Sequence, residues 1–233
     1  EIMPSLVGSE MCIRDSVMGL TEKLIAAIFK EVKGIDIALP LRRMKYDDAI
    51  RYYGSDKPDL RFDMKIHDVH DIFQTTEFGV FQNALGEDSS IVCIKVDGKS
   101  EEFSRKKIDA LTEYIKTYKV KGLPYVKYEN GEFTSGISKF LSDDEKKALI
   151  EELELKDKDM LFFGADKKNI VYTAIGALRL KLGKDLELIN NADYQLLWVV
   201  EFPSFEWSEE EGRYLACHHP FTCLLYTSPS PRD

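Results

Sequence analysis

Strand-like and helix-like segments alternate between residues 68 and 182, and this alternation constrains the fold more than any other feature of the sequence. Apolar runs rich in β-branched and aromatic residues predict strands at residues 90–96, 123–128 and 160–165. Segments with helical periodicity or helix-boundary residues lie between and around them. Because alternating strands and helices pack as layers, we expect a layered α/β unit of roughly 100 residues.

Apolar spacing and boundary residues predict the helices. Ser142 and Glu145 have the Ser-x-x-Glu spacing of a capping box, and Gly34 and Gly183 follow the last periodic residue of two predicted helices. A turn-rich segment at residues 54–62 suggests a boundary, and residues 131–136 are expected to form a loop. The predicted helices cover residues 21–32, 46–53, 68–73, 105–118, 142–153 and 168–182.

Two further strand-like runs, at residues 197–203 and 214–222, are separated by a polar, Gly-containing segment and predict a hairpin with a long turn. The second run contains His218 and His219, half of the four histidines in the chain. Pro220 favours an extended backbone at His219, so the two rings should point to opposite faces. A histidine beside a strand end is more often simply hydrogen-bonded or exposed, so spacing alone does not establish a site.

The two ends of the sequence are related through their codons. Residues 10–16 can be encoded by DNA whose reverse complement, read in a shifted frame, encodes residues 223–228, and the relation extends outward to residues 6–9 and 229–233. We therefore expect residues 1–16 and 223–233 to be adapter-derived, non-native tails, and the part between them to be a piece of a longer gene. A nucleotide sequence without this inverted repeat would contradict the expectation.

Composition excludes several classes of protein. The 233 residues are 44% hydrophobic and 31% charged, as in a globular protein, and no run approaches the roughly 18 apolar residues of a membrane span. A net charge of -9 argues against a broad nucleic-acid interface. Basic stretches at residues 105–107 and 116–121 could touch phosphates, although solvated helix faces are the plainer interpretation.

Local motifs for chemistry are sparse. The sequence has no phosphate-cradling glycine loop, zinc signature or nucleophile elbow. Asp56, Asp59 and Asp166 lie beside basic residues and are expected to form turn-stabilising ion pairs and Asx caps. Without the tails only Cys93 and Cys217 remain, and the absence of a CxxC motif or disulfide framework fits a reduced, cytoplasmic setting.

Six segments, taken in order, resemble bacterial-type aspartyl-tRNA synthetase across nearly the whole native part. Residues 162–166 are similar to the stretch near the end of that family's inserted GAD domain. The resemblance implies an α+β fold in which residues 17–66 and 166–222 are part of a class II antiparallel-sheet core and residues 67–165 are an inserted α/β GAD domain. The six segments are residues 53–62, 104–109, 162–166, 176–183, 198–203 and 218–222.

The resemblance also implies a function. The family activates L-aspartate with ATP and Mg²⁺ and transfers the aspartyl group to tRNA(Asp), as a cytoplasmic homodimer with no membrane attachment. In this chain His218 would contact the L-aspartate and His219 would support it, because an imidazole can donate a hydrogen bond to a carboxylate.

The family's three class II motifs, with the catalytic residues and the ligands of ATP and Mg²⁺, have no counterpart in the sequence. We therefore expect the fragment alone not to activate aspartate. One alternative is a non-catalytic GAD-type tRNA or protein interaction module of an amidotransferase-like protein, and another is that the histidine pair only packs the hairpin. The role of the GAD domain and the charging of tRNA(Asn) stay open.

Overall fold

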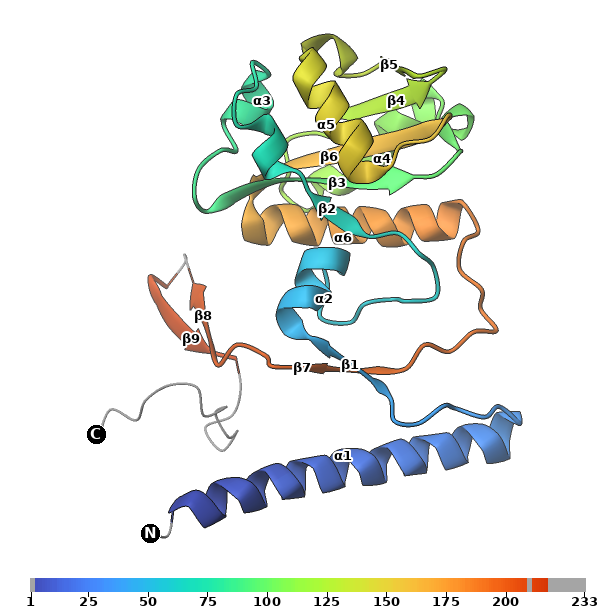
Figure 1. Cartoon of the computed structure of the whole chain (residues 1–233), viewed down its shortest axis with the longest axis vertical. Helices are drawn as coiled ribbons and strands as arrows, with labels where there is room; N and C mark the ends of the chain where they lie inside the picture. Colours follow the sequence, from blue (N-terminus) through green and yellow to red (C-terminus); the bar gives the residue numbers. More distant parts are fainter. Residues whose placement is uncertain (1–2, 209–210, 218–233) are drawn as a thin grey trace. The chain divides into compact units, whose positions relative to one another are not determined.

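The computed structural model describes residues 3–208 and 211–217, with side chains from residue 15 onward (Figure 1). The chain divides into two compact units, residues 1–44 with 196–198 and residues 45–195 with 199–233. Each unit is described by itself.

The first unit is built on helix α1 (Met3–Lys33), which is longer at both ends than the predicted helix at residues 21–32. Gly34 directly follows the last residue of the helix and ends it, as predicted. It has φ +69° and donates its N–H to the Lys30 carbonyl at 2.9 Å. Strand β1 (Arg42–Lys45) pairs with β7 (Leu197–Val200). The Trp198 indole donates to the buried Glu22 carboxylate at 2.8 Å, which satisfies a polar group that is otherwise costly to bury.

The second unit contains a five-stranded antiparallel sheet of order β2-β3-β6-β4-β5. Residues alternate between its two faces, so that Val92 and Ile94 of β3 join one hydrophobic core while Ile91 and Cys93 join the other. The central strands are therefore buried on both faces, which explains their continuous apolar sequences. The strands are β2 (Ile66–Asp68), β3 (Ser89–Val96), β4 (Tyr125–Glu129), β5 (Glu132–Thr134) and β6 (Asp159–Lys167).

Helices cover both faces of this sheet (Figure 1). Helices α4 (Arg105–Lys116) and α6 (Lys168–Asp185) contribute to one core, and α5 (Asp143–Leu153) contributes to the other. Helix α2 (Tyr46–Tyr53) packs against α6. The arrangement is the predicted layered mixture of helices and sheet, with α+β character because every pair of neighbouring strands in this sheet is antiparallel. The shorter helices are η1 (His70–Phe73), α3 (Gly79–Gln82), η2 (Ser100–Glu102) and η3 (Ser138–Phe140).

The capping box predicted at the start of α5 is confirmed. The Ser142 hydroxyl accepts from the Glu145 N–H at 3.2 Å, and the Glu145 carboxylate accepts from the Ser142 N–H at 2.7 Å. Replacing Ser142 with Ala should lower the free energy of unfolding by about 1 kcal/mol, because a helix N–H loses its acceptor. Urea denaturation measures the change, and Ser142→Asp is the control because it keeps an acceptor. Equal losses in both variants would contradict the assignment.

The predicted hairpin between residues 197–203 and 214–222 is wrong. In the structure β7 pairs with β1, while β8 (Phe205–Ser208) pairs with β9 (Arg213–Ala216) in the register Phe205↔Ala216. The turn closes near Gly212, which has φ +59° and donates its N–H to the Ser208 carbonyl oxygen at 2.9 Å. A glycine adopts this left-handed conformation without steric cost, so the shorter hairpin satisfies the same turn signal.

Gly183 does not end its helix as predicted, because α6 continues to Asp185. A Cβ atom at Gly183 would lie 2.7 Å from Cζ of Phe62. This glycine is therefore explained by the close approach of an aromatic ring rather than by a helix stop.

Candidate functional site

Arg179 of α6 joins two of the segments that the sequence analysis singled out, residues 53–62 and 176–183. Its side chain is buried, with only 1% exposed. Nη2 donates to the Asp59 carbonyl at 2.8 Å and to the Phe62 carbonyl at 3.1 Å. Nε donates to the Met64 carbonyl. One guanidinium thus satisfies three backbone acceptors, and we call this arrangement the Arg179 joint.

Aromatic rings enclose the guanidinium of the Arg179 joint. Its Cζ lies 3.9 Å from the centre of the Phe62 ring and 4.9 Å from that of Tyr53, which is cation–π geometry. Burial lowers the pKa of Arg179 to about 10, so the group still carries its charge at neutral pH. The charge is held by carbonyl dipoles and ring faces, and the joint fixes the backbone of residues 59–64.

Two glycines allow α2 and α6 to meet beside this joint. Gly54 follows α2 with φ +65°, and a Cβ there would lie 2.1 Å from the Tyr172 carbonyl oxygen. A Cβ at Gly176 would lie 2.7 Å from the Gly54 carbonyl oxygen. Because the opposing atoms belong to the backbone, no side-chain movement relieves either contact.

Asp59 forms the turn-stabilising contacts expected of it. Its carboxylate accepts from Arg61 Nε at 2.9 Å and from Nη2 at 2.7 Å, and also from the Arg61 N–H at 3.1 Å. Hydrogen bonding to Arg61 lowers the pKa of Asp59. Asp166 accepts from the Lys167 N–H at 2.8 Å, but it lies within strand β6 and pairs with Ser90 of β3, so it does not stabilise a turn as predicted.

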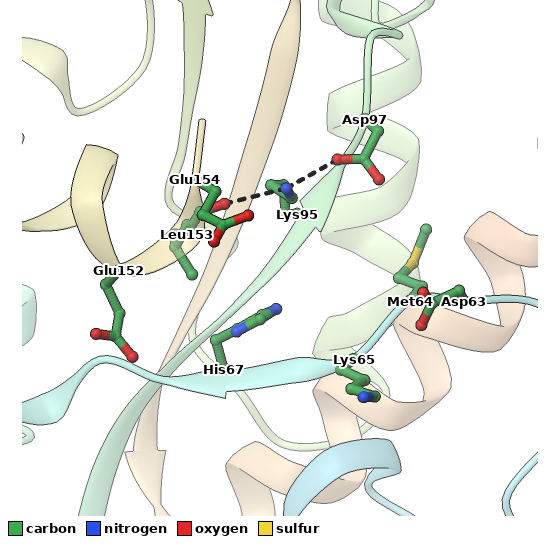
Figure 2. A pocket seen from close by; sticks show the side chains of 9 residues that line it. All are labelled: Asp63, Met64, Lys65, His67, Lys95, Asp97, Glu152, Leu153 and Glu154. Atoms are coloured by element: carbon green, nitrogen blue, oxygen red, sulfur yellow. Dashed lines mark hydrogen bonds and ion pairs between the residues drawn. The ribbon is translucent and has the colours of Figure 1, made fainter. Parts of the chain in front are cut away.

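A charged cavity of about 270 Å³ opens beside β2 and β3 (Figure 2). Lys95 donates to the Leu153 carbonyl at 3.0 Å and pairs with Asp97 at 3.0 Å. Figure 2 shows the His67 ring standing on β2 within this group of charged residues. The cavity is lined by Asp63, Met64, Lys65, His67, Lys95, Asp97, Glu152, Leu153 and Glu154.

Burial lowers the pKa of His67, and the Lys95 charge lowers it further. The imidazole is therefore neutral at pH 7, with one donor and one acceptor nitrogen. Because the folded-state pKa lies below the unfolded value of about 6.5, protonation favours the unfolded chain. The stability contributed by neutral His67 is complete above that value and is lost as the pH falls through the folded-state pKa.

An NMR titration of His67 should give a pKa below about 6.5. Replacing Lys95 with Met should raise this pKa, because a neighbouring positive charge is removed. Lys106→Met, on α4 and outside the cavity, is the matched control and should leave it unchanged. An unchanged His67 pKa in the Lys95→Met variant would show that the two groups do not interact.

A second cluster of polar groups surrounds the Asp68 carboxylate. Its carboxylate accepts from the Tyr172 hydroxyl at 3.1 Å, the Ser90 hydroxyl at 3.2 Å and the His70 N–H at 3.0 Å. Burial, followed by the Asp68 charge, raises the pKa of Tyr172 to about 12, so the phenol stays protonated and donates. This cluster ties β2, β3 and α6 together beside a cavity of about 240 Å³.

Neither a metal site nor a membrane-spanning helix is found among the described residues. Among them, no cluster of three or more His, Cys, Asp or Glu side chains could hold a metal ion. In the same part of the chain, no helix has the length and apolar character needed to cross a bilayer. The charged cavity and the Asp68 cluster supply hydrogen bonds and charge, and the Ser90 hydroxyl lies 3.2 Å from the Asp68 carboxylate.

The residues predicted to contact a substrate, His218 and His219, lie outside the described residues. Their role as an L-aspartate contact and its support stays a prediction. Cys217, which precedes them, follows β9 and is exposed.

Sequence reasoning missed the buried role of Arg179. The signal was present, because residues 175, 178 and 182 define the apolar face of α6 and position 179 falls beside them at helical spacing. An arginine on an apolar helix face requires buried acceptors, and unpaired carbonyls in the preceding turn-rich segment supply them.

Comparison with known proteins shows that part of the chain matches a known domain family. Residues 81–175 match the GAD domain family. This range runs from α3 through the sheet strands β3, β4, β5 and β6 into the first half of α6.

Similarity to longer proteins extends well beyond that domain. The chain is 46% identical over 211 residues to an aspartate–tRNA ligase of Clostridium botulinum (strain Loch Maree / Type A3), covering 91% of this chain. It is 49% identical over 217 residues to an aspartate–tRNA(Asp/Asn) ligase of Hydrogenobaculum sp. (strain Y04AAS1), covering 93% of this chain. The chain spans about 35% of the length of each of these relatives. The chain corresponds to a segment of proteins of the aspartyl-tRNA synthetase family, and this segment includes the GAD domain.

Proposed function

We propose that this chain is part of an enzyme that activates L-aspartate with ATP and transfers the aspartyl group to tRNA(Asp). The observation that carries the proposal is the 46% and 49% identity, over more than nine-tenths of the chain, to two aspartate–tRNA ligases. A match to the GAD domain alone would not separate a ligase from another GAD-containing protein, but the similarity continues on both sides of residues 81–175.

In the proposed enzyme His218 donates a hydrogen bond to the carboxylate of L-aspartate, and His219 supports the pocket. This role is positioning and electrostatic selection of an acidic substrate, not proton abstraction. ATP and Mg²⁺ supply the activation chemistry when bound. The described residues contain no ligand cluster for a metal, so we assign no step of the activation to them.

We further propose the division of the chain implied by the resemblance. Residues 17–66 and 166–222 belong to the catalytic core, residues 67–165 to the GAD insertion, and residues 1–16 and 223–233 to adapter-derived tails. The Arg179 joint supports this division, because it ties residues 59–64 before the insertion to α6 after it. The full enzyme would work as a homodimer in the cytoplasm.

Charging by the full-length protein tests the function. The protein should attach aspartate to tRNA(Asp), and tRNA(Asn) should be assayed beside it because the names of the two relatives differ in this respect. Amidation of a misacylated tRNA, without aspartate activation, would instead identify a non-catalytic GAD-type module of an amidotransferase-like protein and refute the proposal.

A further inference from the structure

A cavity of about 530 Å³ lies in and beside the GAD match, bounded by α3, the loop before β4 and the end of β6. Its volume falls within the range of roughly 300–1,000 Å³ that is typical of small-ligand pockets. The charged cavity at about 270 Å³ and the cavity beside Asp68 at about 240 Å³ fall below it. We call it the GAD cavity.

Part of the wall of the GAD cavity is apolar, and an exposed aromatic ring packs against it. Leu123, Pro124 and Ile137 line it together with Phe78. Phe78 stacks on Phe140, with ring centres 5.1 Å apart and planes inclined by 30°. Phe140 is 57% exposed. The stacked pair therefore presents a π-face at the edge of the cavity.

Polar groups of three kinds line the GAD cavity: two lysines, the Asp166 carboxylate, and an amide with a hydroxyl. Lys121 and Lys167 bring positive charge to its lining, and both are exposed. Asn83 and Ser89 bring an amide and a hydroxyl, and neither side chain makes a hydrogen bond within residues 15–208 and 211–217. Such groups can donate to and accept from the edge of a heterocyclic base.

We propose that the GAD cavity binds an unpaired nucleotide of RNA. The base stacks on Phe140 or enters the cavity beside Leu123, Pro124 and Ile137. The Asn83 amide and the Ser89 hydroxyl form hydrogen bonds with its edge. Lys121 and Lys167 attract the flanking phosphates. Aromatic stacking combined with lysines is the usual chemistry of single-strand recognition. The choice of RNA as the source of the nucleotide rests on the proposed function, in which the enzyme handles tRNA.

The charge of the chain agrees with a local contact of this kind. A net charge of -9 disfavours a broad interface with RNA, whereas one nucleotide in a pocket requires only a few cations nearby. A free mononucleotide should bind weakly, since no glycine-rich loop cradles its phosphates.

Fluorescence anisotropy with this 233-residue chain tests the proposal. The probes are a labelled single-stranded RNA, the same RNA as a duplex, and a labelled nucleoside monophosphate. Single-stranded RNA should bind most tightly. Phe140→Ala should weaken that binding by about 5- to 150-fold, the equivalent of about 1–3 kcal/mol per stacked base.

Lys121→Glu should also weaken binding and reduce its salt dependence. Lys184→Glu changes the net charge by the same amount but lies on α6 outside the cavity and outside the basic stretches, so its effect should be much smaller. Circular dichroism verifies that each variant is folded.

Equal binding of single strand and duplex would overturn the proposal, as would wild-type affinity in both the Phe140 and Lys121 variants. Binding of an acidic aromatic peptide in place of RNA would assign the cavity to protein contact and also overturn it. Because the assay uses no aspartate or ATP, its result is independent of whether the full-length protein charges tRNA.

Discussion

Replacing Arg179 with Met is expected to lower the free energy of unfolding by about 3–5 kcal/mol. The substitution removes the donor of three backbone carbonyls, those of Asp59, Phe62 and Met64. Each acceptor that stays buried without a partner costs about 1–3 kcal/mol. The apolar Met side chain recovers part of the packing against the Phe62 ring, so the sum is not the full cost of three lost bonds.

Urea denaturation of matched variants measures this effect. Lys181→Met, two residues along α6, removes a cation paired with Asp185 near the surface and should cost at most about 1 kcal/mol. Arg179→Lys should fall between the two, because an ammonium keeps the charge but cannot reproduce the planar fork of donors. A loss in Arg179→Met no larger than that in Lys181→Met would mean that the joint does not stabilise the fold.

Replacing Gly54 with Ala is expected to cost about 2–5 kcal/mol, for two separate reasons. The backbone at Gly54 has φ +65°, a conformation that costs an L-residue about 1–2 kcal/mol. The added Cβ would also lie 2.1 Å from the Tyr172 carbonyl oxygen, and such overpacking typically costs about 1–3 kcal/mol.

Gly98→Ala separates the two contributions, because Gly98 has φ +61° but no atom within 4 Å of a built Cβ. It should lose only the conformational part, about 1–2 kcal/mol. Similar midpoints of urea denaturation for Gly54→Ala and Gly98→Ala would show that α2 and α6 separate easily. The predicted result is a clearly larger loss at Gly54.

The elements predicted well from sequence are those whose signals are local. The cores of β3 and β6 read as apolar runs because both of their faces are buried, and the start of α5 is fixed by Ser142 and Glu145. Strands β2 and β5 were missed because three residues are too few to establish a period of two. They form because β3 and β4 offer them edges to pair with.

Two other errors in the fold, the final hairpin and the helix stop at Gly183, have one physical cause, which is long-range contact. The final hairpin was assigned to the wrong strand because β7 pairs with β1, a partner about 150 residues away in the sequence. Gly183 was interpreted as a helix stop because its contact with Phe62 cannot be read from neighbouring residues. The acceptors of Arg179 were hidden for the same reason.

The candidate sites also contain features that local spacing predicts and features that only long-range contacts create. Asp59 contacts Arg61, two positions away, so its turn-stabilising role follows from spacing, whereas Asp166 lies at the end of strand β6 and does not have the role that spacing predicts. The charged cavity brings together β2, β3 and the end of α5, and no local pattern marks it. The roles of His218 and His219 rest on family resemblance, since spacing alone favours histidines that are simply hydrogen-bonded or exposed.

The most direct test of the proposed function is aspartate-dependent ATP–pyrophosphate exchange by the full-length protein, measured for the wild type and for His218→Ala. The wild type should exchange only when L-aspartate is present. His218→Ala should raise the KM for aspartate by about 10- to 100-fold, as expected for one lost hydrogen bond to a charged group, and leave the KM for ATP unchanged. Exchange that does not depend on aspartate, or an unchanged KM for aspartate in the variant, would contradict the account.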